Sequence, residues 1–295
     1  MKLHPRPFAL ALAIALLALA PGAAHAAKAK KVSVALGDSL SVGVQPKAGG
    51  GNRNTSDGYA NQLAKLAGTK LANYGCGGAT SETIYTGKKA CSPALKTPYK
   101  NNSAKTSQLA AAEKYLKANR SKVAFVTIDI GANDVASCAQ GGKLDIPCVT
   151  AGLARLKKNS PVIAKRLRKA AGKDVPLVAM TFYNPFLQSW FTNPGLAEAT
   201  VKIAKDQFNK EIVNAYKDQG FKIADVGTAF GTYKPFTQTT SYKGRAGVPV
   251  AVANICKYTW MCAAAPRGPD IHATKAGYTL IAKTFQATIG RKARG

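Results

Sequence analysis

A serine follows directly after a short apolar segment near the start of the chain. Residues 32–36 (VSVAL) are apolar enough to form a buried strand, and Gly37 and Asp38 then lead into Ser39. Glycine permits the sharp turn that such a strand end requires. Open α/β sheets place their ligands at the carboxyl ends of their strands, so Ser39 is a candidate nucleophile as well as a candidate turn residue.

A serine nucleophile needs a base whose pKa lies near neutrality, and histidine is the usual one. The chain has three histidines, and His4 and His25 lie in an N-terminal segment that we expect to be removed. His272 is therefore the remaining candidate base. Asp270, two residues earlier, is a candidate to orient the imidazole through its carboxylate or its backbone carbonyl, or it takes no part in catalysis.

Four short motifs resemble the sequence blocks of the GDSL, or SGNH, hydrolase family. They are GDSL at 37–40, CGGATS at 76–81, GAND at 131–134 and D-x-H at 270–272, in the order of the family. The G-x-S-x-G pattern of ordinary α/β-hydrolases is missing, because Ser41 takes the place of its last glycine. The last block departs from the D-x-x-H of the family, in which the acid precedes the histidine by three residues.

The resemblance implies a three-layer α/β/α, flavodoxin-like fold with a parallel sheet, and ester hydrolysis without a cofactor or metal. By motif, it implies Ser39 as the nucleophile, with His272 and Asp270 as its catalytic partners. We expect Asp38 and Asp134 to hold their own loops rather than to do chemistry. The long loops and the cysteines are also similar to those of secreted actinobacterial lipases and esterases.

The resemblance also implies an oxyanion hole. Its donors would be the Ser39 backbone N–H, the Gly78 backbone N–H and the Asn133 side-chain amide, with Gly75 and Gly77 as alternatives to Gly78. Donors fixed in advance stabilise the negative charge that develops on the ester oxygen.

Predicted strands and helices alternate along the chain, which indicates βαβ units, a parallel sheet and helices on both of its faces. The strands are expected at 32–36, 70–74, 123–130, 175–181 and 221–226, and the helices at 57–66 (with Asp57 as N-cap), 107–118, 153–167, 204–216 and 274–287. The motifs then lie where strands end. Residues 227–256 are expected to form a long loop, a candidate cover for the site. Aromatic residues after the fourth strand are candidates for an acyl groove or for core packing: Tyr183, Phe186, Trp190 and Phe191.

The N-terminus has the pattern of a secretory signal peptide over residues 1–26. Lys2 and Arg6 precede an apolar run, which ends in small residues suited to cleavage. We expect a disordered lead-in at 27–31 and one hydrolase domain over 32–290. The sequence thus predicts an exported, soluble protein.

Six cysteines, an even number, favour disulfides in an exported protein. Of the fifteen connectivities that six cysteines allow, we expect sequential pairing because each pair brackets one short loop. A zinc site is disfavoured because no cysteine has a histidine nearby. The expected pairs are Cys76 with Cys91, Cys138 with Cys148, and Cys256 with Cys262.

The chain is strongly basic, with a formal net charge of +28. Such a charge attracts anions, so an anionic lipid or cell-wall surface is a candidate partner, and a solvated coat of lysines is the alternative. No nucleic-acid recognition motif accompanies it.

The sequence favours a secreted, monomeric serine esterase or lipase that hydrolyses esters of lipids or acylated carbohydrates. The alternatives are a polysaccharide acetylesterase and a non-catalytic binder of anionic surfaces.

Overall fold

The apolar segment at residues 123–129 forms the middle strand of a five-stranded sheet, and all seven of its side chains are buried. The computed structural model describes residues 1, 2, 4, 29–88, 91, 102–140 and 143–290. Apart from residues 1, 2 and 4, the predicted signal peptide lies outside the described residues. Across the sheet, the strands are β4 (Lys70–Asn73), β1 (Val32–Gly37), β5 (Val123–Asp129), β8 (Leu177–Met180) and β9 (Lys222–Ala224).

Every pair of neighbouring strands in this sheet is parallel. Ranked by their place in the chain, the strands follow the order 2-1-3-4-5, which is the flavodoxin-like order. The predicted α/β fold with a parallel sheet is therefore confirmed. The register pairs Gly37 of β1 with Asp129 of β5, so the two strands end side by side.

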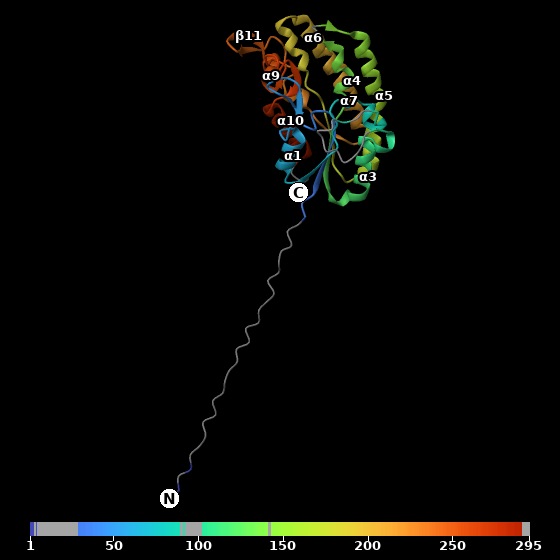
Figure 1. The fold of residues 1–295 in the computed structure, drawn as a ribbon, viewed down its shortest axis with the longest axis vertical. Coiled ribbons are helices and arrows are strands. Elements are labelled where there is room, and N and C mark those ends of the chain that lie inside the picture. The colour runs from blue at the N-terminus through green and yellow to red at the C-terminus, as the bar shows by residue number, and fades with distance from the viewer. Residues whose placement is uncertain (3, 5–28, 89–90, 92–101, 141–142, 291–295) are drawn as a thin grey trace.

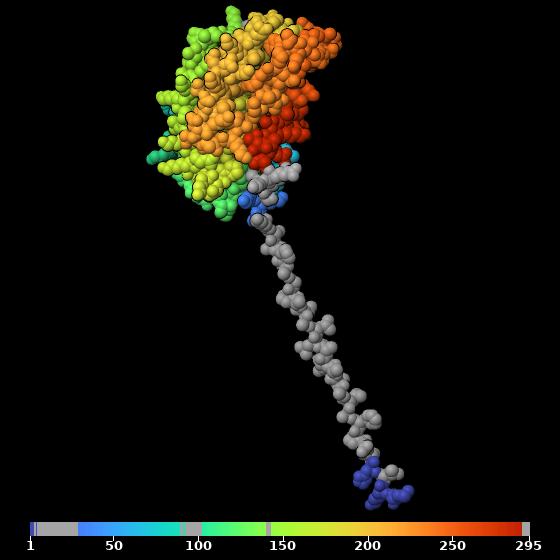
Figure 2. All heavy atoms as spheres, turned by 180° about the vertical axis from the view of Figure 1, so that it is seen from behind, coloured from blue at the N-terminus to red at the C-terminus, as the bar shows by residue number. Residues whose placement is uncertain are grey.

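Helices cover both faces of the sheet (Figure 1). Helices α1 (Tyr59–Ala67) and α10 (Lys275–Ile289) pack together on one face, and α3 (Gln108–Asn119), α5 (Ile146–Ala171) and α7 (Asn209–Lys217) form a layer on the other. Each buries an apolar stripe, as expected for a surface helix. Figure 2 shows the C-terminal segments, in orange and red, on one side of the molecule and segments from the middle of the chain, in green and yellow, on the other.

Short elements connect these layers. They are β2 (Val44–Pro46), β3 (Asn52–Asn54), α2 (Thr83–Thr86), α4 (Ala132–Val135), β6 (Ala139–Gln140), β7 (Lys143–Leu144), a 3-10 helix (Pro185–Phe191), α6 (Pro194–Ile203), a π-helical turn (Ala204–Phe208), α8 (Val226–Ala229), β10 (Thr239–Tyr242), β11 (Arg245–Pro249), α9 (Val250–Tyr258), β12 (Thr259–Trp260) and β13 (Asp270–Ala273).

Residues 227–256 do not form the predicted long loop. They contain the end of α8, the β10–β11 hairpin and most of α9. The hairpin turn is made by Lys243 and Gly244, which both have positive φ angles (48° and 80°), as the tight turns of hairpins require.

The residues around His272 form strand β13, paired antiparallel with β12. Two local predictions were also wrong. The N-cap of α1 is Gly58 and not Asp57, whose carboxylate instead pairs with Lys275 at 3.3 Å. The helix expected at 204–216 begins ten residues earlier, as α6, and continues through the π-helical turn into α7.

Three disulfides join Cys76 to Cys91, Cys138 to Cys148, and Cys256 to Cys262, the sequential pairing expected from the sequence. Each closes a local loop: the first lies after β4, the second brackets β6 and β7, and the third follows α9. No described helix has the length and apolar character needed to cross a membrane.

Candidate active site

Ser39 lies in a tight turn at the carboxyl end of β1, residues 38–43, which we call the nucleophile turn after the role predicted for Ser39. The turn is held by its own main chain, because the Val44 N–H donates to the Ser39 carbonyl oxygen at 3.0 Å. The Asp38 carboxylate accepts the Leu40 N–H at 3.0 Å, so Asp38 does hold its own loop. Among the described residues, neither the Ser39 hydroxyl nor its backbone N–H has a hydrogen-bond partner. Both groups are therefore available to a substrate.

His272 and Asp270 form one compact unit on β13. The Asp270 Oδ1 atom lies 2.7 Å from His272 Nδ1, and the same oxygen accepts the His272 backbone N–H at 2.9 Å. Alternate residues of a strand point to the same side, which brings an acid at position minus two beside the ring. A proton on Nδ1 leaves Nε2 as the acceptor. The shortened D-x-H spacing thus still gives a carboxylate–imidazole pair through the side chain.

A buried tyrosine fixes the backbone between these two residues. Tyr183 donates its hydroxyl proton to the Ile271 carbonyl oxygen at 2.8 Å and stacks on Phe230 with ring centroids 4.5 Å apart. Burial raises the pKa of Tyr183 well above its ordinary value, so the hydroxyl remains a donor at any working pH. Strand β13 is therefore held from the side of the sheet.

Asn133 follows β5 and points its amide toward the nucleophile turn. Its Nδ2 donates to the Ala79 carbonyl oxygen at 2.9 Å and makes a longer contact of 3.3 Å with Asp38 Oδ2. The first bond fixes the orientation of the amide. The second directs the amide toward the turn that holds Ser39.

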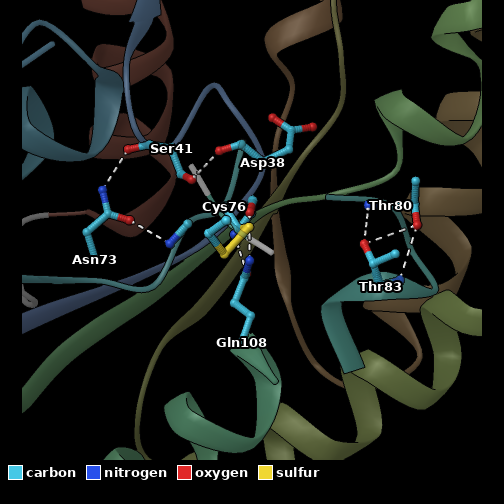
Figure 3. Close-up of a disulfide and its surroundings, with 10 residues drawn as sticks. Asp38, Ser41, Asn73, Cys76, Thr80, Thr83 and Gln108 are labelled. Atoms are coloured by element: carbon cyan, nitrogen blue, oxygen red, sulfur yellow. Dashed lines mark hydrogen bonds between the residues drawn. A yellow bond between two sulfur atoms is a disulfide. The ribbon is translucent and has the colours of Figure 1, made fainter. Parts of the chain in front are cut away.

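The glycine-rich CGGATS segment lies against the same turn (Figure 3). The Cys76 N–H donates to the Gly37 carbonyl oxygen at 3.0 Å, and Asn73 donates to the Ser41 carbonyl oxygen at 2.8 Å. Gly78 has a φ of 73°, a conformation that favours glycine. Gly78 and its alternatives Gly75 and Gly77 do not line the cavity beside Ser39, whereas Asn133 does.

A cavity of about 100 Å³ brings the distant segments together. Ser39, Asn133 and His272 all line it, although they come from three different parts of the chain. Its other walls are mostly apolar and include Ala132, Val135, Ala136, Ala139, Leu144, Val149, Phe182, Phe186, Ile203, Ala204 and Phe208. The arrangement provides a hydroxyl, an imidazole with its carboxylate, and an amide donor around one apolar space. That is the set of groups that acyl transfer to a serine needs.

The family model described as GDSL-like Lipase/Acylhydrolase matches residues 34–285 of the chain. The chain belongs to this family. As a GDSL hydrolase it is a carboxylic ester hydrolase, in agreement with the prediction from its motifs.

Solved structures share the fold of this GDSL hydrolase. Phospholipase A1 from Streptomyces albidoflavus NA297 is 17% identical, with a TM-score of 0.52, and the match covers 88% of this chain and 100% of that one. Protein YXIM from Bacillus subtilis is 14% identical, with a TM-score of 0.51, and covers 90% and 57% of the two chains. A search of curated protein sequences finds no match to the chain.

A second cavity, of about 530 Å³, adjoins the first and shares Ala136, Ala139, Phe186, Thr200 and Ile271 with it. Its remaining walls are more polar and include Ser137, Lys143, Gln188 and Thr192. The aromatic residues after β8 divide between the two roles expected for them, lining an acyl groove and packing against other side chains. Tyr183 and Phe186 line the first cavity, while Trp190 and Phe191 pack on each other and on the Arg245 guanidinium.

The carboxyl groups of the GDSL hydrolase site differ in their pKa. Burial raises the pKa of Asp38 to about 6, and burial together with the charge of Asp38 raises the pKa of Asp129 well above its ordinary value. Burial alone would also raise the pKa of Asp270, but its hydrogen bond to His272 and the charge of that ring bring the pKa below the ordinary value. Asp270 is therefore the carboxyl that stays ionised beside the imidazole.

Asp134 links two loops rather than holding only its own. It accepts hydrogen bonds from the Ser81 N–H and hydroxyl, both at 2.8 Å, and lies 3.7 Å from Arg155. The GAND and CGGATS segments are thereby joined at a buried site.

Within the described part of the chain, no cluster of three or more His, Cys, Asp or Glu side chains could hold a metal ion.

Sequence reasoning missed two residues that hold the nucleophile turn. Gln108 of α3 donates to the Gly37 carbonyl oxygen at 2.9 Å and accepts the Gly37 N–H at 2.8 Å (Figure 3). Asp129, at the end of β5, accepts hydrogen bonds from the Asp38 and Ser41 N–H groups of the turn. The signal for Asp129 was its place in VAFVTIDI, where a carboxylate interrupts a run that is otherwise apolar and buried.

Proposed function

We propose that the chain is an exported serine esterase that works through an acyl-enzyme formed on Ser39. One observation carries the proposal: Ser39, Asn133 and His272 line the same cavity, and Asp270 holds the Nδ1 side of the imidazole. Two residues of this set lie more than two hundred positions apart in the sequence. Both line a cavity beside the carboxyl end of β1, and open α/β folds place their sites at such strand ends.

In the first half of the reaction, Ser39 Oγ attacks the ester carbonyl carbon while His272 Nε2 takes the hydroxyl proton. The carbonyl π electrons move to the oxygen, which becomes an oxyanion. The Ser39 N–H and the Asn133 amide, which both line the cavity, donate to it. The C–O bond to the alcohol then breaks, and the imidazolium returns its proton to the leaving oxygen.

In the second half, a water molecule takes the place of the alcohol. His272 removes a proton from this water, which attacks the acyl carbon and forms the second oxyanion. Its collapse breaks the bond to Ser39 and releases the carboxylic acid. Asp270 stabilises the imidazolium in both halves and remains ionised throughout.

Two further observations support export. The N-terminal sequence has the pattern of a signal peptide, and the three disulfides are typical of oxidising compartments. The excess of 42 Lys and Arg over 14 Asp and Glu favours an anionic lipid or cell-wall surface as the place where the enzyme acts.

Labelling with a fluorophosphonate tests the proposed function, because this reagent phosphonylates a serine only when a base and an oxyanion hole activate it. We expect one label per chain, mapped by peptide mass spectrometry to Ser39. Ser137, a serine in the wall of the neighbouring cavity, supplies the matched control, and Ser137→Ala should label like the wild type. A label on another residue, or no label on the folded protein, would contradict the assignment.

For the substrate, we propose an ester of an aliphatic acid with a larger polar alcohol, such as a lipid or an acylated carbohydrate. The acyl chain would occupy the apolar cavity beside Ser39, and the alcohol would occupy the wider and more polar one. The π-helical turn supports this division because its Ala204 and Phe208 side chains line the apolar cavity.

A series of p-nitrophenyl esters from acetyl to decanoyl tests this division. Ala204→Phe reduces the space for the acyl chain, so kcat/KM for the longest ester that the wild type accepts should fall about tenfold or more, with acetyl ester hydrolysis nearly unchanged. Ala118→Phe, on the exposed face of α3, makes the same change away from the cavity and should leave the profile unaltered. An equal loss for all chain lengths would place the acyl group elsewhere.

A further inference from the structure

The Asp129 carboxyl is buried directly beneath the nucleophile turn. Its Oδ1 accepts the Tyr59 hydroxyl proton at 2.6 Å, and its Oδ2 accepts the Ser41 N–H at 3.2 Å and the Asp38 N–H at 3.3 Å. On the opposite side, the carboxyl is so close to Gly37 that a Cβ there would overlap it. Asp129 is fully buried, and no role in the reaction described above uses it.

These contacts divide the N–H groups of the turn into two kinds. The Ser41 N–H is bound by the Asp129 carboxyl, the Asp38 N–H by that carboxyl and by the Asp129 backbone carbonyl oxygen at 3.1 Å, and the Leu40 N–H by the Asp38 carboxylate. Ser39 lies between them, and its N–H has no partner among the described residues. A carboxyl that binds the flanking donors therefore fixes the peptide of Ser39 without consuming its donor.

The surroundings keep this carboxyl in place. Tyr59 is fully buried and stacks on Phe285, with ring centroids 4.9 Å apart. Asp38 and Asp129 are both nearly inaccessible to solvent, and burial raises the pKa of each carboxyl above its ordinary value.

We propose that Asp129 is a positioning residue, whose carboxyl binds the N–H groups on either side of Ser39 and thereby directs the Ser39 N–H toward the ester oxygen. The proposal rests on the proposed function of Ser39 as nucleophile and oxyanion donor. Asp129 itself touches no reacting atom. Its effect should appear in the transition state, where the oxyanion exists, and not in the binding of the neutral ester.

Asp129→Leu removes the acceptor oxygens at nearly constant size, and Asp129→Asn keeps one acceptor for the two N–H groups. Loss of one oxyanion donor typically lowers turnover ~10²–10³-fold, so the leucine variant should lose about 10²-fold in kcat with KM within threefold of the wild type. Its affinity for a boronic acid, which mimics the tetrahedral intermediate, should fall in parallel. The asparagine variant should stay within about fivefold in both measurements, because it retains the interaction.

A variant that only weakens the fold controls for lost stability. Leu116→Ala removes a fully buried side chain of α3 away from the cavity and should lower the Tm while leaving kcat and boronate affinity unchanged. If Asp129→Leu does not fold, Asp129→Ala leaves room for a water molecule and should still lose at least about tenfold in kcat.

Three results would overturn the role of Asp129. They are a kcat within threefold of the wild type in the folded leucine or alanine variant, the same loss of boronate affinity in Leu116→Ala, and an equally large loss in Asp129→Asn. Fluorophosphonate labelling of wild-type Ser39 is independent of these outcomes. It separates a failure of this proposal, in which Ser39 still labels, from a failure of the proposed function, in which it does not.

Discussion

Ser39→Ala is expected to lower kcat/KM for a p-nitrophenyl ester by about 10⁴–10⁶-fold, since removal of a serine nucleophile alone costs an enzyme nearly all of its covalent catalysis. The physical reason is that, in the proposed mechanism, Oγ is the atom that forms the acyl bond. Without it, the His272–Asp270 pair has only water to activate, and the remaining donors can only stabilise an attack by that water. The measurement is steady-state hydrolysis, with the Tm recorded to show that the variant is folded.

A double variant makes this test sharper. If Ser39 and His272 act in the same step, the double variant Ser39→Ala with His272→Ala should lose no more activity than Ser39→Ala alone. Without the serine hydroxyl, the histidine has no nucleophile to deprotonate, so its removal has no further effect. Losses that multiply would show that the two residues act independently. Retention of more than about a hundredth of the activity in Ser39→Ala would place the nucleophile on another residue.

Asp270→Asn is expected to reduce kcat by about 10³–10⁴-fold, by analogy with the same change in a protease triad. The carboxylate oxygen bonds both the His272 ring nitrogen and the His272 backbone N–H. An amide can still satisfy one of these donors, but it neither fixes the productive tautomer nor stabilises the imidazolium. Hydrolysis over a range of pH, at saturating ester, measures the effect on kcat.

Asp57→Asn is the matched control for Asp270→Asn. The Asp57 carboxylate pairs with Lys275, which begins α10 shortly after β13 in the sequence. Neither residue lines the cavity beside Ser39. Substitution of Asp57 should leave kcat within about twofold, since an exposed ion pair contributes little. A loss below tenfold in Asp270→Asn would instead assign the orientation of His272 to the Asp270 backbone carbonyl.

The sequence predicted the sheet well because its strands carry strong local signals. Buried parallel strands are continuous apolar runs, and β5 is such a run over its whole length. The motif residues Ser39 and Asn133 follow β1 and β5, so a prediction of parallel strands already placed them at the same edge of the sheet. The pairing of cysteines within short loops was equally local.

The parts that the sequence did not predict depend on long-range contacts. Strand β13 exists because Thr259 and Trp260 pair with it, and no local pattern in PDIHA favours a strand. Gln108 and Asp129 hold the nucleophile turn from α3 and β5, and their partners lie 71 to 91 positions away in the sequence. A polar residue within an otherwise buried segment was the available signal in the case of Asp129.

In the proposed mechanism, the double hydrogen bond of Asp270 makes the acid and the base one structural unit. Both come from a single strand of four residues, so their mutual geometry is preserved when that strand moves as a body. Catalytic alignment then reduces to one tertiary relation, the approach of β13 to the end of β1. Insertions in the peripheral loops of this enzyme can therefore reshape the substrate entrance while the proton-transfer pair stays intact.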